Sequence, residues 1–248
     1  MNPEGIKPYT SDGSKGEQVE TMFDNIAPAY DFMNTAMTFG MHRRWLRKAL
    51  DASGSGEGRE RSAIIDLATG TGEVAFRLAA MYPRARILGV DLSDGMLRIA
   101  ERKLRESHSD LDGRVSFTHG DCLSLEVPDD SFDLLTIAYG VRNFENLEKG
   151  FREFHRVLKP GGSFMILELS RPENRLTRLG YDLYARGVIP MVGRMVSRDS
   201  RAYSYLPQSI AAMPPRRRIA AMLEEAGFGN VRYRSLTLGV VTYYTGEK

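Results

Sequence analysis

The sequence predicts an α/β protein with a doubly wound, mostly parallel sheet of seven strands. Over residues 63–169, five short apolar segments alternate with segments of helical periodicity. Such alternation is typical of parallel sheets with right-handed crossovers. Two further β-rich segments, 231–238 and 240–245, meet at Leu238-Gly239 and predict a closing hairpin.

The N-terminal region divides into two parts. Residues 1–18 are polar and predict a flexible arm, and residues 19–248 predict one domain. Residues 19–50 contain many large apolar side chains interleaved with polar ones. We expect two short helices, which either dock on the core or form a lid over an apolar ligand, because methionine and aromatic surfaces adapt to flat rings. The large side chains are Met22, Phe23, Ile26, Tyr30, Phe32, Met33, Met37, Phe39, Met41 and Trp45.

The strand predicted at 63–67 leads into the turn Gly70-Thr71-Gly72 and then into a helix. Glycines let backbone N–H groups approach a ligand, and a helix N-terminus adds partial positive charge. The next strand ends at Asp91, 21 residues after Gly70. An acid at that distance is placed to accept hydrogen bonds from ribose hydroxyls. The set predicts a nucleotide-like cofactor, and the alternative is a βαβ unit with an ordinary tight turn.

The elements that follow continue the same pattern. A helix is predicted at 93–107 and strands at 115–119 and 132–138. Another helix, 147–158, is predicted to stop at Lys159-Pro160-Gly161-Gly162, before a strand at 164–169. Asp121 and Arg142 each follow a strand, as Gly70 and Asp91 do. Since ligands bind beyond the carboxyl ends of parallel strands, we expect these four residues to meet at one site.

Residues 171–215 predict a helical insertion before the last strands. Residues 171–218 hold ten arginines and three acidic residues, a net charge of +7, although the whole chain carries only +2. The insertion is either solvated on its arginine face or a lid that touches an anionic membrane surface and shields a lipidic substrate. Pro190 predicts a kink or a division of its helix. Pro215 predicts the start of a last helix, 218–225.

Composition excludes several classes of protein. A net charge of +2 makes a general attraction to nucleic acid weak. The single cysteine, Cys122, excludes an internal disulfide and a cysteine-cluster metal site, and no metal-binding pattern is visible. We expect neither a secretory signal nor a membrane span, because no apolar run of about 18 residues occurs. These features suit a cytoplasmic protein.

Five motifs are distinctive: MFDNIAPAYDFMN (22–34), FGMHRRW (39–45), YGVRNF (139–144), RVLKPGG (156–162) and YSYLPQSI (203–210). They resemble the class I S-adenosylmethionine-dependent methyltransferases, and more specifically the demethylmenaquinone and ubiquinone C-methyltransferase family. The resemblance runs from about Val19 to the C-terminus. The glycine turn and Lys-Pro-Gly-Gly are shared by many methyltransferases, whereas the N-terminal and Arg-Asn motifs narrow the match to the quinone group.

The resemblance implies S-adenosylmethionine as the cofactor. It places Asp91 on the ribose and Asp121-Cys122 at the adenine, with the backbone N–H of Cys122 as donor and its thiol incidental. The family often has Ser at the position of Ala138, so a hydroxyl contact is missing here. The cofactor-binding residues that we expect are Asp66, Gly70, Thr71, Gly72, Asp91, Asp121 and Cys122.

The implied reaction is C-methylation of demethylmenaquinol to menaquinol, or of a benzoquinol in the ubiquinone pathway. Arg142, Asn143 and Tyr30 are the candidate catalytic residues, and Asp31 and His42 are weaker candidates for a proton relay. Arg142 either stabilises the phenolate form of the quinol or locks its loop through a salt bridge. The implied partners are a lipidic quinol and, peripherally, the inner face of the membrane, with no nucleic acid and with a homodimer possible.

Three other functions stay open. The arginine-rich insertion suits a methyltransferase that acts on RNA or protein. The chain can also be a non-catalytic protein that binds the cofactor or a membrane. The first βαβ unit alone suits a dinucleotide oxidoreductase.

Overall fold

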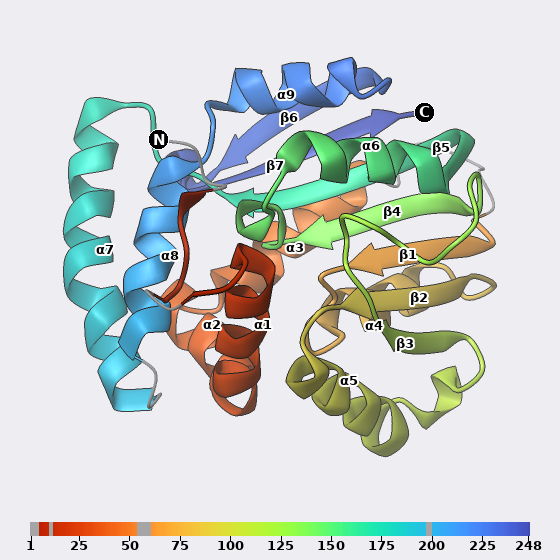
Figure 1. The fold of residues 1–248 in the computed structure, drawn as a ribbon, viewed down its shortest axis with the longest axis horizontal. Coiled ribbons are helices and arrows are strands. Elements are labelled where there is room, and N and C mark those ends of the chain that lie inside the picture. The colour runs from red at the N-terminus through yellow and green to blue at the C-terminus, as the bar shows by residue number, and fades with distance from the viewer. Residues whose placement is uncertain (1–4, 10–11, 54–60, 197–199) are drawn as a thin grey trace.

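The sheet is open and has the strand order β3-β2-β1-β4-β5-β7-β6 (Figure 1). The structure is a computed structural model that describes residues 5–9, 12–53, 61–196 and 200–248. All neighbouring strands pair in parallel except β7, which runs antiparallel to both β5 and β6. The predicted doubly wound, mostly parallel sheet of seven strands is confirmed. The strands are β1 (Ala63–Leu67), β2 (Arg86–Asp91), β3 (Val115–His119), β4 (Phe132–Ala138), β5 (Leu158–Leu169), β6 (Gly229–Leu236) and β7 (Val241–Glu247).

Side chains alternate between the two faces of the central strands, so one sheet supports two apolar layers. In β1, Ile65 packs toward α6 and α9, whereas Ile64 packs toward α3 and α4. Leu135 and Leu134 of β4 divide in the same way. The covering helices are α3 (Met41–Ser53), α4 (Glu73–Met81), α6 (Leu147–Val157) and α9 (Arg216–Glu225).

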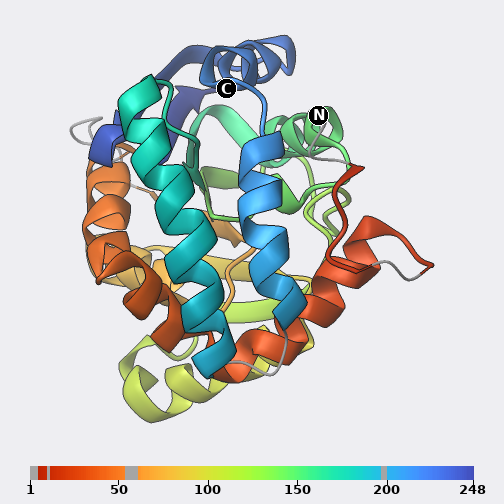
Figure 2. The same ribbon diagram turned by 90° about the vertical axis from the view of Figure 1, so that its left-hand side faces the viewer.

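A third apolar cluster lies beside the sheet. It joins α1 (Lys15–Ile26) and α2 (Tyr30–Thr38) to α5 (Asp94–Ser107), α7 (Arg175–Val196) and α8 (Ser200–Ala212). Figure 2 views α7 and α8 from outside, with α2 and α3 next to them. The N-terminal helices and the segment between β5 and α9 therefore meet, although more than 100 residues separate them in sequence. None of the described helices is long and apolar enough to cross a bilayer.

Several predicted boundaries are wrong. Helix α1 already begins at Lys15, and the side chain of Lys15 is buried, so the last residues of the predicted arm belong to this helix. Residues 1–4 and 10–11 of the arm lie outside the described residues. Lys159–Gly162 lies inside β5, where a shift in the pairing with β4 accommodates it. Helix α7 runs through Pro190 undivided, and Pro215 is the N-cap of α9, which begins at Arg216.

Candidate active site

A cavity of about 260 Å³ lies at the carboxyl ends of β1, β2 and β4, and we call it the polar cavity. Gly70, Asp91, Asp121 and Cys122 line it together. Their convergence is the expected result for residues that follow neighbouring parallel strands. Arg142, the fourth residue expected here with Gly70, Asp91 and Asp121, lines a different cavity, while its neighbour Asn143 lines this one.

Asp91 is held from two sides at the end of β2. One carboxylate oxygen accepts from the N–H of Gly70 at 2.7 Å, and the other accepts from the N–H of Ser93 at 2.9 Å. Burial raises the pKa of Asp91, and these two backbone hydrogen bonds oppose that rise. A carboxylate has about four lone-pair sites, so Asp91 keeps acceptor capacity for a ligand in the cavity.

Asp121 and Cys122 form the next part of the wall. Asp121 accepts from the N–H of Leu123 at 2.9 Å, which holds its loop. Burial raises the pKa of the Cys122 thiol far above neutrality. A thiol that stays protonated is a poor nucleophile, so Cys122 contributes its backbone and its shape rather than covalent chemistry.

Three of the predicted cofactor-binding residues support the glycine turn and do not line the polar cavity. The carboxylate of Asp66 is fully buried and accepts from the hydroxyls of Thr69 and Thr136, each at 2.6 Å; burial raises its pKa to about 7. The hydroxyl of Thr71 donates to Asp31 at 2.6 Å. Gly72 caps α4 with φ at +84°, a conformation that favours glycine.

The charge of the polar cavity distinguishes between cofactors. Among the described residues that line it, none is Lys, Arg or His. A pyrophosphate-bearing dinucleotide would lack a cationic partner on these walls. An adenosine that carries a sulfonium cation fits them, because the carboxylates accept from hydroxyl and amino groups and attract positive charge. The acidic residues of the lining are Glu17, Glu20, Asp91, Asp121 and Glu145.

Helices α1 and α2 cover the polar cavity and are fixed there by polar contacts. Lys15 donates to the carbonyl oxygens of Arg142 at 3.1 Å and Phe144 at 2.9 Å. Asp24 accepts from the hydroxyl of Ser93 at 2.6 Å. Asp31, a candidate for a proton relay, pairs with Lys103 at 2.5 Å and so joins α2 to α5. Asp31 lines neither cavity, so its contacts hold α2 in place rather than reach a ligand.

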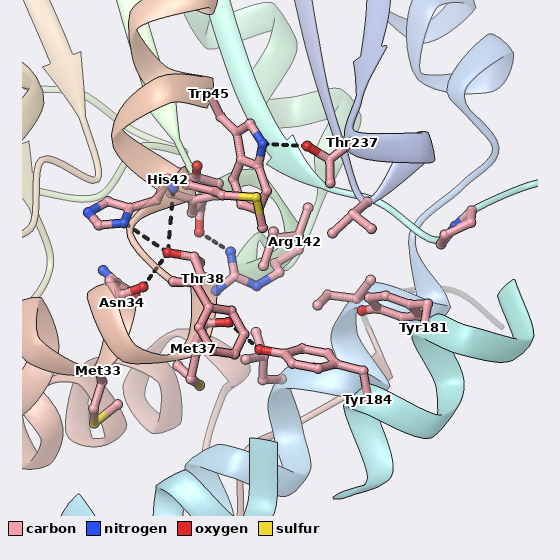
Figure 3. A pocket seen from close by; sticks show the side chains of 18 of the residues that line it. Met33, Asn34, Met37, Thr38, His42, Trp45, Arg142, Tyr181, Tyr184 and Thr237 are labelled. Carbon is pink, nitrogen blue, oxygen red and sulfur yellow. Dashed lines mark hydrogen bonds between the residues drawn. The ribbon is translucent and has the colours of Figure 1, made fainter. Parts of the chain in front are cut away.

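A larger cavity of about 500 Å³ lies next to the first, and we call it the apolar cavity (Figure 3). Its walls come from α2, α3, α7, α8 and the β6–β7 turn. Trp45 donates to the hydroxyl of Thr237 at 2.7 Å, and the hydroxyl of Tyr184 donates to the carbonyl oxygen of Met37. The prominent lining residues in Figure 3 are Met33, Met37, Trp45, Tyr181 and Tyr184. A methionine and aromatic lining suits a flat apolar ring.

The two cavities share the side chains of Phe23, Tyr30 and Tyr139. Burial raises the pKa of Tyr30, although a hydrogen bond with Asn34 and the charge of Arg142 oppose the rise. The phenol of Tyr30 is therefore protonated at neutral pH and is able to donate a hydrogen bond. The hydroxyl of Tyr139 is buried and has no hydrogen-bond partner among the described residues.

Arg142 forms a buried ion pair with Glu168 on β5, with 3.0 Å between the guanidinium and the carboxylate. The carboxylate of Glu168 also accepts from the backbone N–H groups of Arg142 at 3.1 Å and Leu169 at 2.8 Å. Burial disfavours the charge of Arg142, but Glu168, Tyr30 and Tyr205 together outweigh this effect and raise the pKa of the guanidinium. The salt bridge that one interpretation of Arg142 predicted is thus present. Nε of Arg142 has no hydrogen-bond partner among the described residues. Arg142 also lines the apolar cavity, so its side chain lies beside any ligand held there.

The other candidate residues take different positions. The side-chain oxygen of Asn143 accepts from the hydroxyl of Tyr205 at 3.1 Å, which connects the polar cavity to α8. Nδ1 of His42 lies 2.9 Å from the hydroxyl of Thr38, and Nε2 lies 3.8 Å from Glu73. Figure 3 shows the His42 ring directed away from Arg142 and the tyrosines. That orientation disfavours a direct role for His42 in proton transfer.

Sequence reasoning did not assign Tyr139, Glu168 or Lys15 to the site. Tyr139 and Glu168 carry a usable signal, because each stands at the carboxyl end of a predicted strand, where ligand-binding residues gather. Lys15 carries no such signal, since it lies in a segment whose composition predicts an arm.

Gly140, beside Tyr139, permits a close approach of two chain segments. A Cβ atom at residue 140 would stand 2.7 Å from the Cβ of Ala68, which has no rotamer with which to move away. We expect Gly140→Ala to lower the free energy of unfolding by about 1–3 kcal/mol, measured by urea denaturation. The matched control is Gly180→Ala on α7, where the added Cβ meets no described atom within 4 Å. Equal stability of the two variants would contradict this account of Gly140.

Similarity to known proteins agrees with this geometry. Residues 11–248 match the model of the ubiE/COQ5 methyltransferase family. The chain belongs to the ubiE/COQ5 methyltransferase family. Demethylmenaquinone methyltransferases of Porphyromonas gingivalis and Bacteroides fragilis are 46% and 42% identical to it, and the matches cover 100% and 99% of this chain and 100% and 98% of theirs. A ubiquinone/menaquinone biosynthesis C-methyltransferase of Syntrophotalea carbinolica is 44% identical over 93% of this chain and 94% of its own. Family membership confirms the predicted class of enzyme, a methyltransferase.

Solved structures support the fold. A methyltransferase of Thermotoga maritima superposes with a TM-score of 0.63 at 18% identity and covers 92% of this chain and 99% of its own. A Haemonchus contortus phosphoethanolamine N-methyltransferase, solved with S-adenosylhomocysteine, gives a TM-score of 0.62 at 17% identity over 83% of this chain. This chain spans 52% of the length of that enzyme. At such identities the likeness shows the fold alone.

Proposed function

We propose that the chain transfers a methyl group from S-adenosylmethionine to a ring carbon of demethylmenaquinol and so forms menaquinol. The observation that carries this proposal is the pair of adjoining cavities. The polar one is acidic and suits a cationic nucleoside, the apolar one suits a flat ring, and Phe23, Tyr30 and Tyr139 stand between them. The names of the relatives from P. gingivalis and B. fragilis support the same substrate.

When bound, S-adenosylmethionine supplies an electrophilic methyl group. Asp91 would accept from the ribose hydroxyls, Asp121 would accept from the adenine amino group, and the N–H of Cys122 would donate to the adenine ring. Gly70 leaves room for the ligand at the turn, and Asp66, Thr71 and Gly72 hold the turn in place. Helices α1 and α2 exclude water from the transfer path.

Arg142 is the residue that activates the acceptor in this proposal. A ring carbon of a quinol becomes nucleophilic when the neighbouring hydroxyl loses its proton, and a phenol pKa near ~10 opposes this loss. A guanidinium beside that oxygen lowers the pKa of the phenol. Tyr30 donates a hydrogen bond at the boundary of the cavities, and Asn143 connects the wall to Tyr205. These contacts align the ring with the methyl group, and such alignment supplies much of the rate.

A benzoquinol of the ubiquinone pathway is the second candidate substrate, and the name of the S. carbinolica relative favours it. We further propose a cytoplasmic protein at the inner face of the membrane, where lipidic quinols reside. Homodimer formation stays a prediction. Light scattering, which gives the molar mass of the purified chain in solution, tests it.

The direct test uses purified protein, S-adenosylmethionine with a labelled methyl group, and short-chain demethylmenaquinol kept reduced. We expect label in the naphthoquinol and less in the matching benzoquinol. Transfer RNA in a parallel reaction tests the nucleic-acid alternative. Absence of label from both quinols, while calorimetry shows that the cofactor binds, would overturn the substrate assignment.

A further inference from the structure

The outer face of α7 is apolar and open to solvent. Leu176, Leu179 and Leu183 are 79%, 69% and 76% exposed. Their spacing of three and four residues places them on one side of the helix. Tyr181 and Tyr184 point the other way and line the apolar cavity. Helix α7, which Figure 2 views from outside, therefore carries tyrosines on the side of the cavity and leucines on the side of the solvent.

The apolar cavity reaches exposed residues beside the leucine row. Phe39, which ends α2, and Leu238, in the β6–β7 turn, both line the cavity and yet are 76% and 77% exposed. Both hold positive φ angles, +50° and +57°. Gly180 of α7, also exposed and also part of the lining, lies between the leucines in sequence. Exposed apolar side chains thus line the cavity, and Gly180 places part of its wall on the helix that carries the leucine row.

Exposed basic side chains adjoin the residues of this apolar surface in the sequence. Arg43 and Arg44 are exposed just after Phe39, and Arg175 is exposed next to Leu176. The two acids nearest in sequence are already paired, because Glu173 contacts Arg216 at 2.6 Å and Asp182 contacts Arg171 at 2.6 Å. Apolar side chains within a basic border match an anionic lipid surface, whose head groups attract arginine and whose interior takes up leucine.

We propose that this surface docks on an anionic lipid bilayer, so that the mouth bordered by Phe39, Gly180 and Leu238 opens into the acyl chains. The inference rests on the proposed function, since it explains how a lipidic quinol reaches the apolar cavity. A cavity of about 500 Å³ has the volume of a drug-sized ligand site. The ring enters it, and a long isoprenoid tail stays in the bilayer.

The test compares the wild-type chain with the triple variant Leu176→Ser, Leu179→Ser, Leu183→Ser. None of these leucines lines either cavity. The probe is vesicles of equal parts phosphatidylcholine and phosphatidylglycerol, with or without a long-chain demethylmenaquinol. We expect the variant to lose about tenfold in vesicle affinity and in kcat/KM for the embedded quinol. Turnover of a short-chain quinol in detergent-free buffer should stay at the wild-type value.

The control is Met81→Ser, which replaces an exposed apolar residue at the end of α4. It should bind vesicles as the wild type does. Wild-type and triple-variant chains that bind vesicles equally, or not at all, would overturn the inference. So would a wild-type dimer that the triple variant breaks in the absence of lipid, because the leucines would then contact a second copy. Failure of the wild type to methylate the short-chain quinol would instead refute the proposed function, and vesicle binding would still be measured independently.

Discussion

We expect variants that remove the charge of Arg142, of Glu168 or of both to change the free energy of unfolding and the rate of methyl transfer in different orders. Arg142→Met leaves a buried carboxylate and Glu168→Gln leaves a buried guanidinium. Each single variant should lose about 3–5 kcal/mol of unfolding free energy, because breaking one half of a buried pair leaves an uncompensated charge. The double variant holds neither charge, and the introduced glutamine keeps one oxygen for one of the two backbone N–H groups that Glu168 now binds, while its N–H₂ faces the other. It should regain part of the stability in urea denaturation.

Methyl transfer should follow a different order. We expect kcat for the quinol to fall by about 10²- to 10³-fold in both variants that lack Arg142, the range for a lost group that stabilises developing charge. Affinity for S-adenosylmethionine should change little, because Arg142 lines the apolar cavity and not the polar one. Recovery of turnover together with stability in the double variant would show that Arg142 only maintains the fold.

Asp91→Asn should abolish most of the cofactor affinity. Asparagine keeps one acceptor oxygen but turns an amide N–H₂ toward Gly70 or Ser93, whose N–H groups now donate to the carboxylate. Loss of hydrogen bonds to a charged group corresponds to about 1.5–3 kcal/mol, or roughly 10- to 100-fold in Kd by calorimetry.

Asp94→Asn is the matched control. Asp94 is exposed at the start of α5, and its substitution changes the net charge by the same amount as Asp91→Asn. Its Kd should equal that of the wild type. If Asp91→Asn binds S-adenosylmethionine as tightly as Asp94→Asn does, Asp91 does not contact the cofactor.

The carboxyl edge of the sheet was predictable because it depends on local pattern and one topological rule. Each of Gly70, Asp91 and Asp121 follows an apolar strand, and parallel strands bring such residues together. The wrong boundaries have a different origin. Lys159–Gly162 has the composition of a helix stop followed by a turn, but β5 pairs with β4 on either side of it, and Gly161 and Gly162 exchange backbone hydrogen bonds with Lys248, just after β7.

The apolar cavity was less predictable, because its walls come from segments far apart in the chain. Periodicity indicated that Tyr181 and Tyr184 share one side of a helix. It gave no sign that this side would face Met37 and Trp45, or that Leu176 and Leu183 would be left exposed. The pairing of Arg142 with Glu168 was equally unpredictable, since the sequence around a glutamate near the end of a strand does not indicate which residue it pairs with.

The acidic lining of the polar cavity has a consequence for turnover. In the proposed reaction the methyl donor arrives in this cavity as a cation and leaves as a neutral thioether, while the five carboxylates of the lining stay in place. At ~8 Å, one carboxylate attracts a unit positive charge by about 0.5–2 kcal/mol, according to the local dielectric. The reaction itself therefore removes part of the attraction that retained the donor. Chemistry at the sulfur weakens product inhibition and favours exchange of the spent molecule for a fresh one.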